Sequence, residues 1–138
     1  MKYLVRIERV NNIIEEEVTV LIKNIELKCF THSMNEEIEV GIEYYANIEY
    51  EIFDDFIVQE MDIKKKDIKN IKDKFSYIIY GKVDIEEKKI KSTIDIDINE
   101  FDSYVLSKFD NKYIKFKVDR FNIEFLKKID YIFWLKTK

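Results

Sequence analysis

The sequence predicts a single α+β domain built mainly of antiparallel β-strands. Apolar and polar residues alternate along several segments, as they do in a strand with one buried face. These segments follow one another without the strand–helix alternation of a parallel sheet. The 138 residues are 46% hydrophobic and 14% aromatic, enough for one packed core over residues 1–138. We expect a curved sheet, barrel or sandwich of six to seven strands with one or two short helices.

The first two strands are predicted over residues 2–7 and 17–29. The pair Asn11–Asn12 can supply the turn between them, because asparagine tolerates a positive φ. In the second segment the apolar positions change from even to odd residues near Lys23–Asn24. One inserted residue would produce this change, so we predict a β-bulge there.

A long alternating segment follows the predicted loop 30–37. Every even position from 38 to 52 is apolar, and most odd positions are glutamate or another polar residue. A strand of this length would exceed the usual range, so we predict a bend near Gly41 or Asn47.

Residues 53–75 change character, and a short basic helix is predicted within 62–74. The apolar residues in and beside this segment have helical spacing. The segment is rich in lysine, but it lacks the arginines and interleaved aromatics that favour nucleic-acid binding. We interpret the lysines as a solvated helix face. The apolar residues are Met61, Ile68, Ile71 and Phe75, and the lysines are Lys64, Lys65, Lys66, Lys69, Lys72 and Lys74.

Residues 77–85 and 90–98 form the clearest predicted hairpin, joined by the loop 86–89. The second segment places Asp95 and Asp97 on one face, about 7 Å apart. Paired carboxylates can perform acid–base or metal chemistry. We interpret this pair instead as the solvated face of a half-buried strand.

A helix is predicted to begin at Asn99, with Asp102 completing a capping box. Its predicted buried stripe has helical spacing. The last predicted strand covers residues 113–125 and changes parity at Asp119–Arg120. The predicted stripe consists of Phe101, Tyr104, Val105 and Phe109.

Catalytic and metal chemistry have little support in the sequence. Cys29 is the only cysteine, which excludes an internal disulfide, and His32 is the only histidine. Their spacing could form a nucleophile–base pair or a metal clip with Glu36 and Glu37, yet a buried structural cysteine is the simpler interpretation. We expect no enzymatic activity, no cofactor and no metal. The absence of a signal peptide or a long apolar run predicts a cytoplasmic protein without membrane contact.

The most unusual feature is an acidic window between Lys28 and Lys64. It holds ten aspartate or glutamate residues and no lysine or arginine, although the whole chain carries a net charge of only −4. Carboxylates at alternate positions of one strand repel each other. One interpretation is that Lys115 and Lys117 lie on a neighbouring strand and pair with these glutamates. The other is that the carboxylates form a recognition surface.

The recognition surface leads to the preferred functional hypothesis. A small non-catalytic protein would neutralise a basic protein partner, as an immunity protein for a nuclease-type toxin or a phage-type inhibitor of a defence nuclease. Charge would steer the encounter, and aromatic residues would supply contact area. The predicted partner-binding residues are Glu39, Glu43, Tyr45, Glu49, Glu51, Asp54 and Asp55.

Two alternatives belong to other functional classes. The element order is compatible with an oligonucleotide-binding (OB)-like barrel, which would use the lysine segment and exposed tyrosines to bind nucleic acid. A chaperone-like or structural oligomer is the other alternative, with the apolar tail Ile129–Leu135 forming a homodimer contact.

Overall fold

The computed structural model describes residues 2–11, 13, 16–31, 38–72 and 74–129. The described chain divides into two compact units. The barrel unit comprises residues 2–48 and 122–129, and the sheet unit comprises residues 49–121. Two strands, β4 (Glu43–Glu51) and β11 (Arg120–Lys128), contribute residues to both units. The single domain over residues 1–138 stays a prediction.

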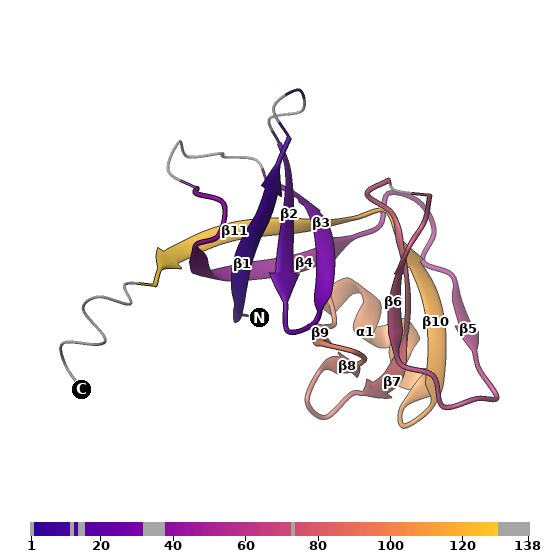
Figure 1. Cartoon of the computed structure of the whole chain (residues 1–138). Coiled ribbons are helices and arrows are strands. Elements are labelled where there is room, and N and C mark those ends of the chain that lie inside the picture. Colours follow the sequence, from indigo (N-terminus) through magenta and orange to yellow (C-terminus); the bar gives the residue numbers. More distant parts are fainter. Residues whose placement is uncertain (1, 12, 14–15, 32–37, 73, 130–138) are drawn as a thin grey trace, which may run out of the picture. The chain divides into compact units, whose positions relative to one another are not determined.

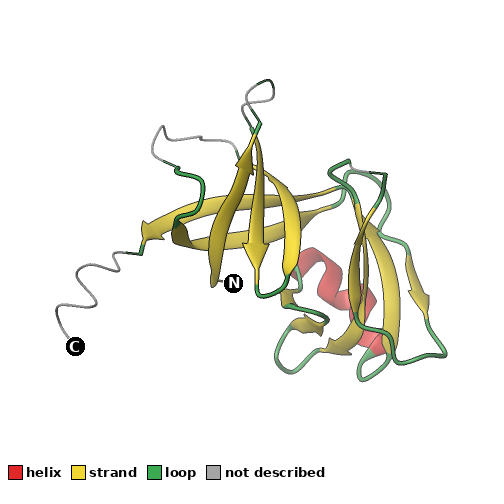
Figure 2. Ribbon diagram, in the orientation of Figure 1, coloured by secondary structure: helices red, strands yellow, loops and turns green. Residues whose placement is uncertain are grey.

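The mainly antiparallel α+β class is confirmed. Figure 2 shows strands throughout the described chain and one α-helix. The described residues form eleven strands rather than six to seven. The predicted strands 17–29, 90–98 and 113–125 are each divided into two, and two short strands lie within residues 53–75, where none was predicted.

The barrel unit is built on a closed five-stranded barrel with the strand order β1-β2-β3-β11-β4 (Figure 1). Its first three strands are β1 (Lys2–Val10), β2 (Glu17–Ile22) and β3 (Ile25–Phe30). Pairing of β1 with β4 closes the barrel. Buried residues alternate with more exposed ones along most of these strands, whereas in β2 Thr19 is buried between Val18 and Val20. The fully buried side chains include Ile7, Val18, Val20, Leu27 and Cys29.

The bulge predicted at Lys23–Asn24 is wrong, because these two residues form a hairpin turn. Ile22 lies opposite Ile25 in the β2–β3 register, and Lys23 takes a φ of 54°. A two-residue turn places even residues of one strand opposite odd residues of the next. The change of parity is therefore the signature of the turn. The turn predicted at Asn11–Asn12 includes Asn12, which lies outside the described residues.

The bend predicted near Gly41 is confirmed. Gly41 lies in a turn with a φ of 85°, a conformation that glycine adopts without strain. The strand β4 is consequently shorter than the predicted segment 38–52 and begins at Glu43. Within β4 the predicted alternation holds, and the buried residues are Tyr44, Ala46, Ile48 and Tyr50.

The sheet unit contains a six-stranded sheet with the order β5-β10-β7-β8-β9, and β6 also pairs with β7. Its buried side includes Ile79, Val83, Ile90 and Ile114. The elements are β5 (Val58–Glu60), β6 (Asp67–Asn70), β7 (Tyr77–Asp84), β8 (Lys89–Lys91), β9 (Asp95–Asp97), the α-helix α1 (Glu100–Leu106), the 3-10 helix η1 (Ser107–Phe109) and β10 (Tyr113–Val118).

The basic helix predicted within 62–74 is wrong. Residues Asp67–Asn70 form strand β6, which pairs with β7. The Ile71 N–H donates a 2.9 Å hydrogen bond to the Ser76 carbonyl, and Lys72 takes a φ of 52° in the connecting turn. The apolar residues that suggested a helix include Ile68, which instead lies opposite Ile79 in the β6–β7 register.

The predicted strand 90–98 is divided into β8 and β9, which pair with each other around residues 92–94. Its apolar residues Ile90, Ile94, Ile96 and Ile98 are nevertheless all buried. The loop before it spans residues 85–88, one residue earlier than predicted, because Asp84 lies opposite Lys89.

The predicted capping box and buried stripe of α1 are wrong. Asn99 occupies the N-cap position but makes no side-chain capping bond. Phe101 and Tyr104 are 95% and 77% exposed, and the buried residue of the helix is Leu106. The helix therefore buries a different face from the predicted one. Asp102 turns inward, where its carboxylate accepts a hydrogen bond from Tyr50.

The parity change at Asp119–Arg120 is confirmed. Even residues of β10 are buried up to Val118, and odd residues of β11 are buried from Phe121. Asp119 lies between the two strands, which belong to different sheets.

Candidate binding surfaces

The acidic residues predicted to bind a partner follow the exposed side of β4 and the segment beside it. The pleat turns Glu43, Tyr45 and Glu49 away from the buried row of β4. The predicted set is divided between the two units. Glu39, Glu43 and Tyr45 belong to the barrel unit, and Glu49, Glu51, Asp54 and Asp55 belong to the sheet unit.

In the barrel unit, Glu43 is compensated by an arginine. It lies opposite Arg6 in the β1–β4 register, and its carboxylate is 3.7 Å from the Arg6 guanidinium. Glu39 is exposed, and its backbone N–H donates a 3.1 Å hydrogen bond to the Tyr44 hydroxyl. Tyr45 is 45% exposed. This unit therefore offers one exposed carboxylate and one exposed phenol from the predicted set.

In the sheet unit, Glu51 is also compensated. The Arg120 Nη2 atom lies 3.3 and 3.4 Å from the two Glu51 carboxylate oxygens. The same guanidinium lies 5.1 Å from the centroid of the Phe53 ring. The Phe53 N–H donates a 2.7 Å hydrogen bond to the Asp119 carboxylate. Asp119 thus holds the chain beyond β4 in place, and Arg120 partly neutralises the charge of Glu51.

The other carboxylates of the predicted set in this unit are available to a partner. Glu49, Asp54 and Asp55 are exposed, and they form no ion pair with the described part of the chain. Phe53, which lies among them in the sequence, is 60% exposed. We call Glu49, Phe53, Asp54 and Asp55 the acidic segment. It combines three uncompensated charges with an exposed aromatic ring.

The predicted pairing with Lys115 and Lys117 is wrong. Both lysines are on β10, which pairs with β5 and β7. Lys115 lies opposite Gln59 and Tyr80, and the Lys117 ammonium is 4.0 Å from Asp119. Arg6 and Arg120, which were not predicted as partners, are the cations that compensate Glu43 and Glu51 of β4. Antiparallel neighbours of β4 could not be identified from a strand pattern alone.

The residues considered for catalysis do not form a reactive site in the described chain. Cys29 is fully buried, and this burial raises the pKa of its thiol. His32, Glu36 and Glu37 lie outside the described residues. Among the residues that the structure describes, no group of three or more His, Cys, Asp or Glu side chains could hold a metal ion.

Asp95 has a structural partner. Its carboxylate accepts a 3.3 Å hydrogen bond from Lys91, which also donates to Glu87. The hydrogen bond to Glu87, with help from Asp95, raises the pKa of Lys91. Asp97 lies opposite Lys89 in the β8–β9 register. The two aspartates are therefore associated with lysines of the adjacent strand.

The comparisons with known proteins give a family and no activity. The model of the family described as "Uncharacterised conserved protein UCP019853" matches residues 1–126. No curated protein and no solved structure matches the chain. Within the described residues, no helix has the length and apolar character needed to cross a membrane.

Proposed function

Because the chain belongs to this family, whose description gives no activity, we propose its function from its described surfaces. It is a small, cytoplasmic, non-catalytic binding protein that neutralises a basic protein partner. In this role it acts as an immunity protein for a nuclease-type toxin or as a phage-type inhibitor of a defence nuclease. The inhibition is steric and electrostatic, and it involves no turnover.

The observation that carries this proposal is the uncompensated charge of the acidic segment. Glu49, Asp54 and Asp55 are exposed and unpaired among the described residues. A group of exposed negative charges accelerates association with a cationic partner through long-range attraction. Phe53 adds exposed apolar area, which interfaces use for affinity. A protein that grips nucleic acid would present the matching basic groove.

The predicted site residues are not expected to contribute equally to the attraction of a basic partner. Glu43 and Glu51 are each held by an arginine of the chain, so their charges are partly neutralised before any partner arrives. Glu39 and Tyr45 remain proposed contacts on the barrel unit. We expect the sheet-unit residues Asp54 and Asp55 to dominate the electrostatic steering.

The test compares two doubly charge-reversed variants. The tagged wild-type protein captures partners from a lysate of the native host, and mass spectrometry identifies them. Association rates of the purified partner are then measured at low and high salt. Asp54→Lys/Asp55→Lys should slow association by about tenfold or more at low salt and by less at high salt.

The matched control is Glu86→Lys/Glu124→Lys, which makes the same change of charge at two exposed glutamates outside the acidic segment. It should affect association only weakly. A partner that is acidic, or an association rate that changes equally in both variants, would contradict the proposal. Inhibition of a captured nuclease by the wild-type chain, lost in Asp54→Lys/Asp55→Lys, would support it.

A second candidate is nucleic-acid binding by an OB-like barrel, although the predicted lysine segment lies in the sheet unit and not in the barrel unit. The strand order β1-β2-β3-β11-β4 matches that of five-stranded OB barrels, many of which bind oligonucleotides. This is a likeness of fold, and fold alone does not assign function. One cation of β1 is also already paired, because Arg9 lies 3.0 Å from Glu26 of β3. The homodimer through Ile129–Leu135 stays a prediction, since residues 130–135 lie outside the described chain.

A further inference from the structure

The sheet of the sheet unit has one covered side and one open side. On the covered side, Phe116 of β10 makes edge contacts with Tyr50 and Phe56, at ring-centroid distances of 5.7 and 5.4 Å. Residues of the opposite parity on β10 and β7 point the other way and keep intermediate or high exposure. The open side is therefore a solvent-facing surface made by several strands.

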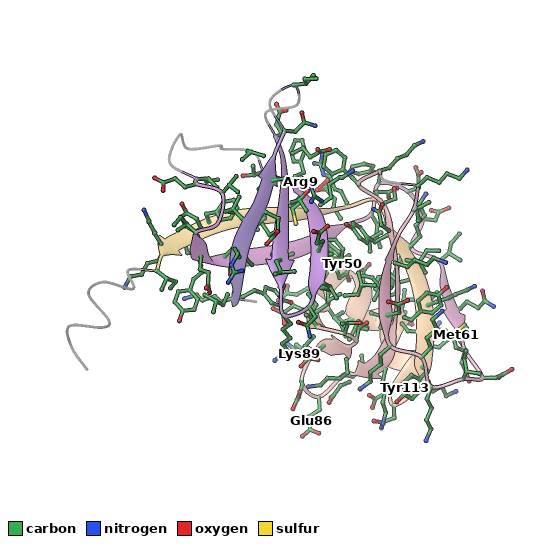
Figure 3. The ribbon with its side chains drawn as sticks, viewed as in Figure 1. Arg9, Tyr50, Met61, Glu86, Lys89 and Tyr113 are labelled. Carbon is green, nitrogen blue, oxygen red and sulfur yellow. The ribbon has the colours of Figure 1, made fainter. Side chains whose placement is uncertain are left out.

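The register collects lysines and tyrosines on this open side. Tyr113 lies opposite Lys82, and Lys115 lies opposite Tyr80. Lys117 lies opposite Ile78, which is in turn opposite Lys69 of β6. Directly opposite residues on one face have Cβ atoms about 5 Å apart. Figure 3 labels Tyr113 within this unit. We call this surface the lysine–tyrosine face: Lys69, Lys82, Lys115, Lys117, Tyr80 and Tyr113.

Most of these lysines are not neutralised by the protein. Lys69, Lys82 and Lys115 form no ion pair with the described part of the chain. Lys117 has only a 4.0 Å approach to Asp119. Lys91 on the neighbouring strand β8 differs, because Glu87 and Asp95 both bind its ammonium. The lysines of this face without an ion pair thus lie on β6, β7 and β10, and the register places two aspartates, Asp67 and Asp84, on the same side.

The tyrosines make the face more than a cluster of charges. The Lys65 ammonium lies 4.1 Å from the centroid of the Tyr80 ring, which shows that this ring accepts a cation. Tyr113 is partly exposed beside Lys82. A surface of this kind can hold phosphates with its ammonium groups and stack a base on an aromatic ring.

We propose that the lysine–tyrosine face binds single-stranded nucleic acid. Lysine acts as a point charge for phosphate, and the lack of arginine on the face argues against readout of base edges. A single strand exposes bases that can stack on tyrosine, whereas a duplex does not. The binding is therefore tolerant of sequence and sensitive to salt.

The net charge of −4 does not oppose this binding at close range. At physiological ionic strength, charges separated by more than about 8 Å are largely screened. A strand on the open side therefore interacts mainly with the nearby lysines. The proposal also stands apart from neutralisation of a basic partner, because it uses no residue of the acidic segment.

The experiment measures binding of a fluorescent oligothymidylate of about 20 nucleotides by anisotropy, at several salt concentrations. The logarithm of the association constant should fall with the logarithm of salt concentration with a slope of about −2 to −3, as expected for three or four lysine–phosphate contacts. Lys82→Glu/Lys115→Glu should weaken binding by about tenfold or more and reduce the slope. Lys69→Glu/Lys117→Glu, at two exposed positions, is a second variant if the first does not fold.

The matched control is Lys127→Glu/Lys128→Glu, which changes the charge equally at two exposed lysines of β11. It should retain affinity within about twofold. Tyr113→Phe should bind like the wild type, and Tyr113→Ala should lose at least about fivefold. No binding by the wild-type chain at low salt would overturn the proposal. Equal losses in the face and control variants, or equally effective competition by polyglutamate or duplex DNA, would overturn it as well.

Discussion

The hydroxyl of Tyr50 donates a 2.6 Å hydrogen bond to the carboxylate of Asp102. The same hydroxyl accepts a 3.1 Å hydrogen bond from the backbone N–H of Asn99. Tyr50 is buried near the end of β4 and is labelled in Figure 3. Tyr50 therefore accepts the hydrogen bond from the Asn99 N–H that the predicted capping box assigned to Asp102, and it ties the start of α1 to the covered side of the sheet.

Replacing Tyr50 by phenylalanine should destabilise the protein. The ring and its contact with Phe116 are retained, but Asp102 loses its donor and the Asn99 N–H loses its acceptor. Leaving partly buried polar groups unsatisfied costs about 1–3 kcal/mol. The free energy of unfolding in urea, measured for Tyr50→Phe and the wild type, should show this loss.

Tyr45→Phe is the matched control, because Tyr45 lies on the same strand and is 45% exposed. Its free energy of unfolding should change by less than about 0.5 kcal/mol. A loss of the same size in both variants would show that the hydrogen bonds of Tyr50 have no special importance.

The Tyr50 hydroxyl should also affect the dependence of stability on pH. Burial, followed by the hydrogen bond to Asp102, raises the pKa of Tyr50 above the ordinary tyrosine value of about 10. The folded state therefore keeps the proton at a pH where the unfolded state releases it. This contribution to stability is fully present below pH of about 10 and is lost as the pH rises above it, by at most about 1.4 kcal/mol per pH unit.

Unfolding measurements at about pH 8 and about pH 11 can isolate this effect. Wild-type stability should fall more than that of Tyr50→Phe over this interval, because the variant has no hydroxyl at position 50. Parallel losses in the two proteins would mean that other groups account for the alkaline destabilisation.

The barrel strands were largely predictable because one-sided burial imposes a period of two. The alternation in β1 and β4 identified the buried rows correctly, and the parity change beside Asp119 marked a real strand boundary. The parity change at Lys23–Asn24 has two physical explanations, a bulge or a tight turn. Only the pairing of Ile22 with Ile25 distinguishes them.

The orientation of α1 was not predictable from spacing. Its seven residues offer Phe101 and Tyr104 as apolar candidates for the buried face, yet both are exposed. The decisive contact is made by Asp102 with Tyr50, 52 residues away in the sequence. The spacing of apolar residues does not predict the buried face of a helix when a polar residue turns inward to bind a distant partner.

Charge placement depended on pairing between strands that are distant in sequence. The lysine segment contains no interleaved aromatic residue, and for this reason it was interpreted as a solvated face. In the folded sheet, however, β7 and β10 place Tyr80 and Tyr113 on the same face as Lys69. The acidic window likewise contained no cation, yet Arg6 and Arg120 compensate two of its glutamates. Sequence indicates which charges are exposed, and strand order determines which charges meet.

Gly81→Ala should destabilise the sheet unit. A Cβ at this position of β7 would lie 2.7 Å from the Lys91 carbonyl oxygen and 2.8 Å from Ile90 Cγ2. The carbonyl belongs to the backbone of β8 and cannot move without disturbing the β7–β8 pairing. Such overpacking costs about 1–3 kcal/mol, which urea unfolding would detect.

Gly41→Asn provides a comparison at the other glycine. No atom lies within 4 Å of a Cβ at Gly41, and asparagine tolerates its positive φ. This variant should lose less than about 1 kcal/mol. A Gly81→Ala protein as stable as the wild type would mean that β8 can shift to accept a methyl group.

Cys29 should react with a thiol reagent only when the protein opens. Its side chain is fully buried, and burial raises the pKa of the thiol, so the reactive thiolate is disfavoured in the folded state. Because the chain has one cysteine, absorbance from an aromatic disulfide reagent reports this site alone. In native buffer the labelling rate should be at least about a thousandfold lower than in urea, since only transiently opened molecules react. Rapid stoichiometric labelling of the folded protein at neutral pH would instead identify an accessible, activated thiol and revive the nucleophile hypothesis for Cys29.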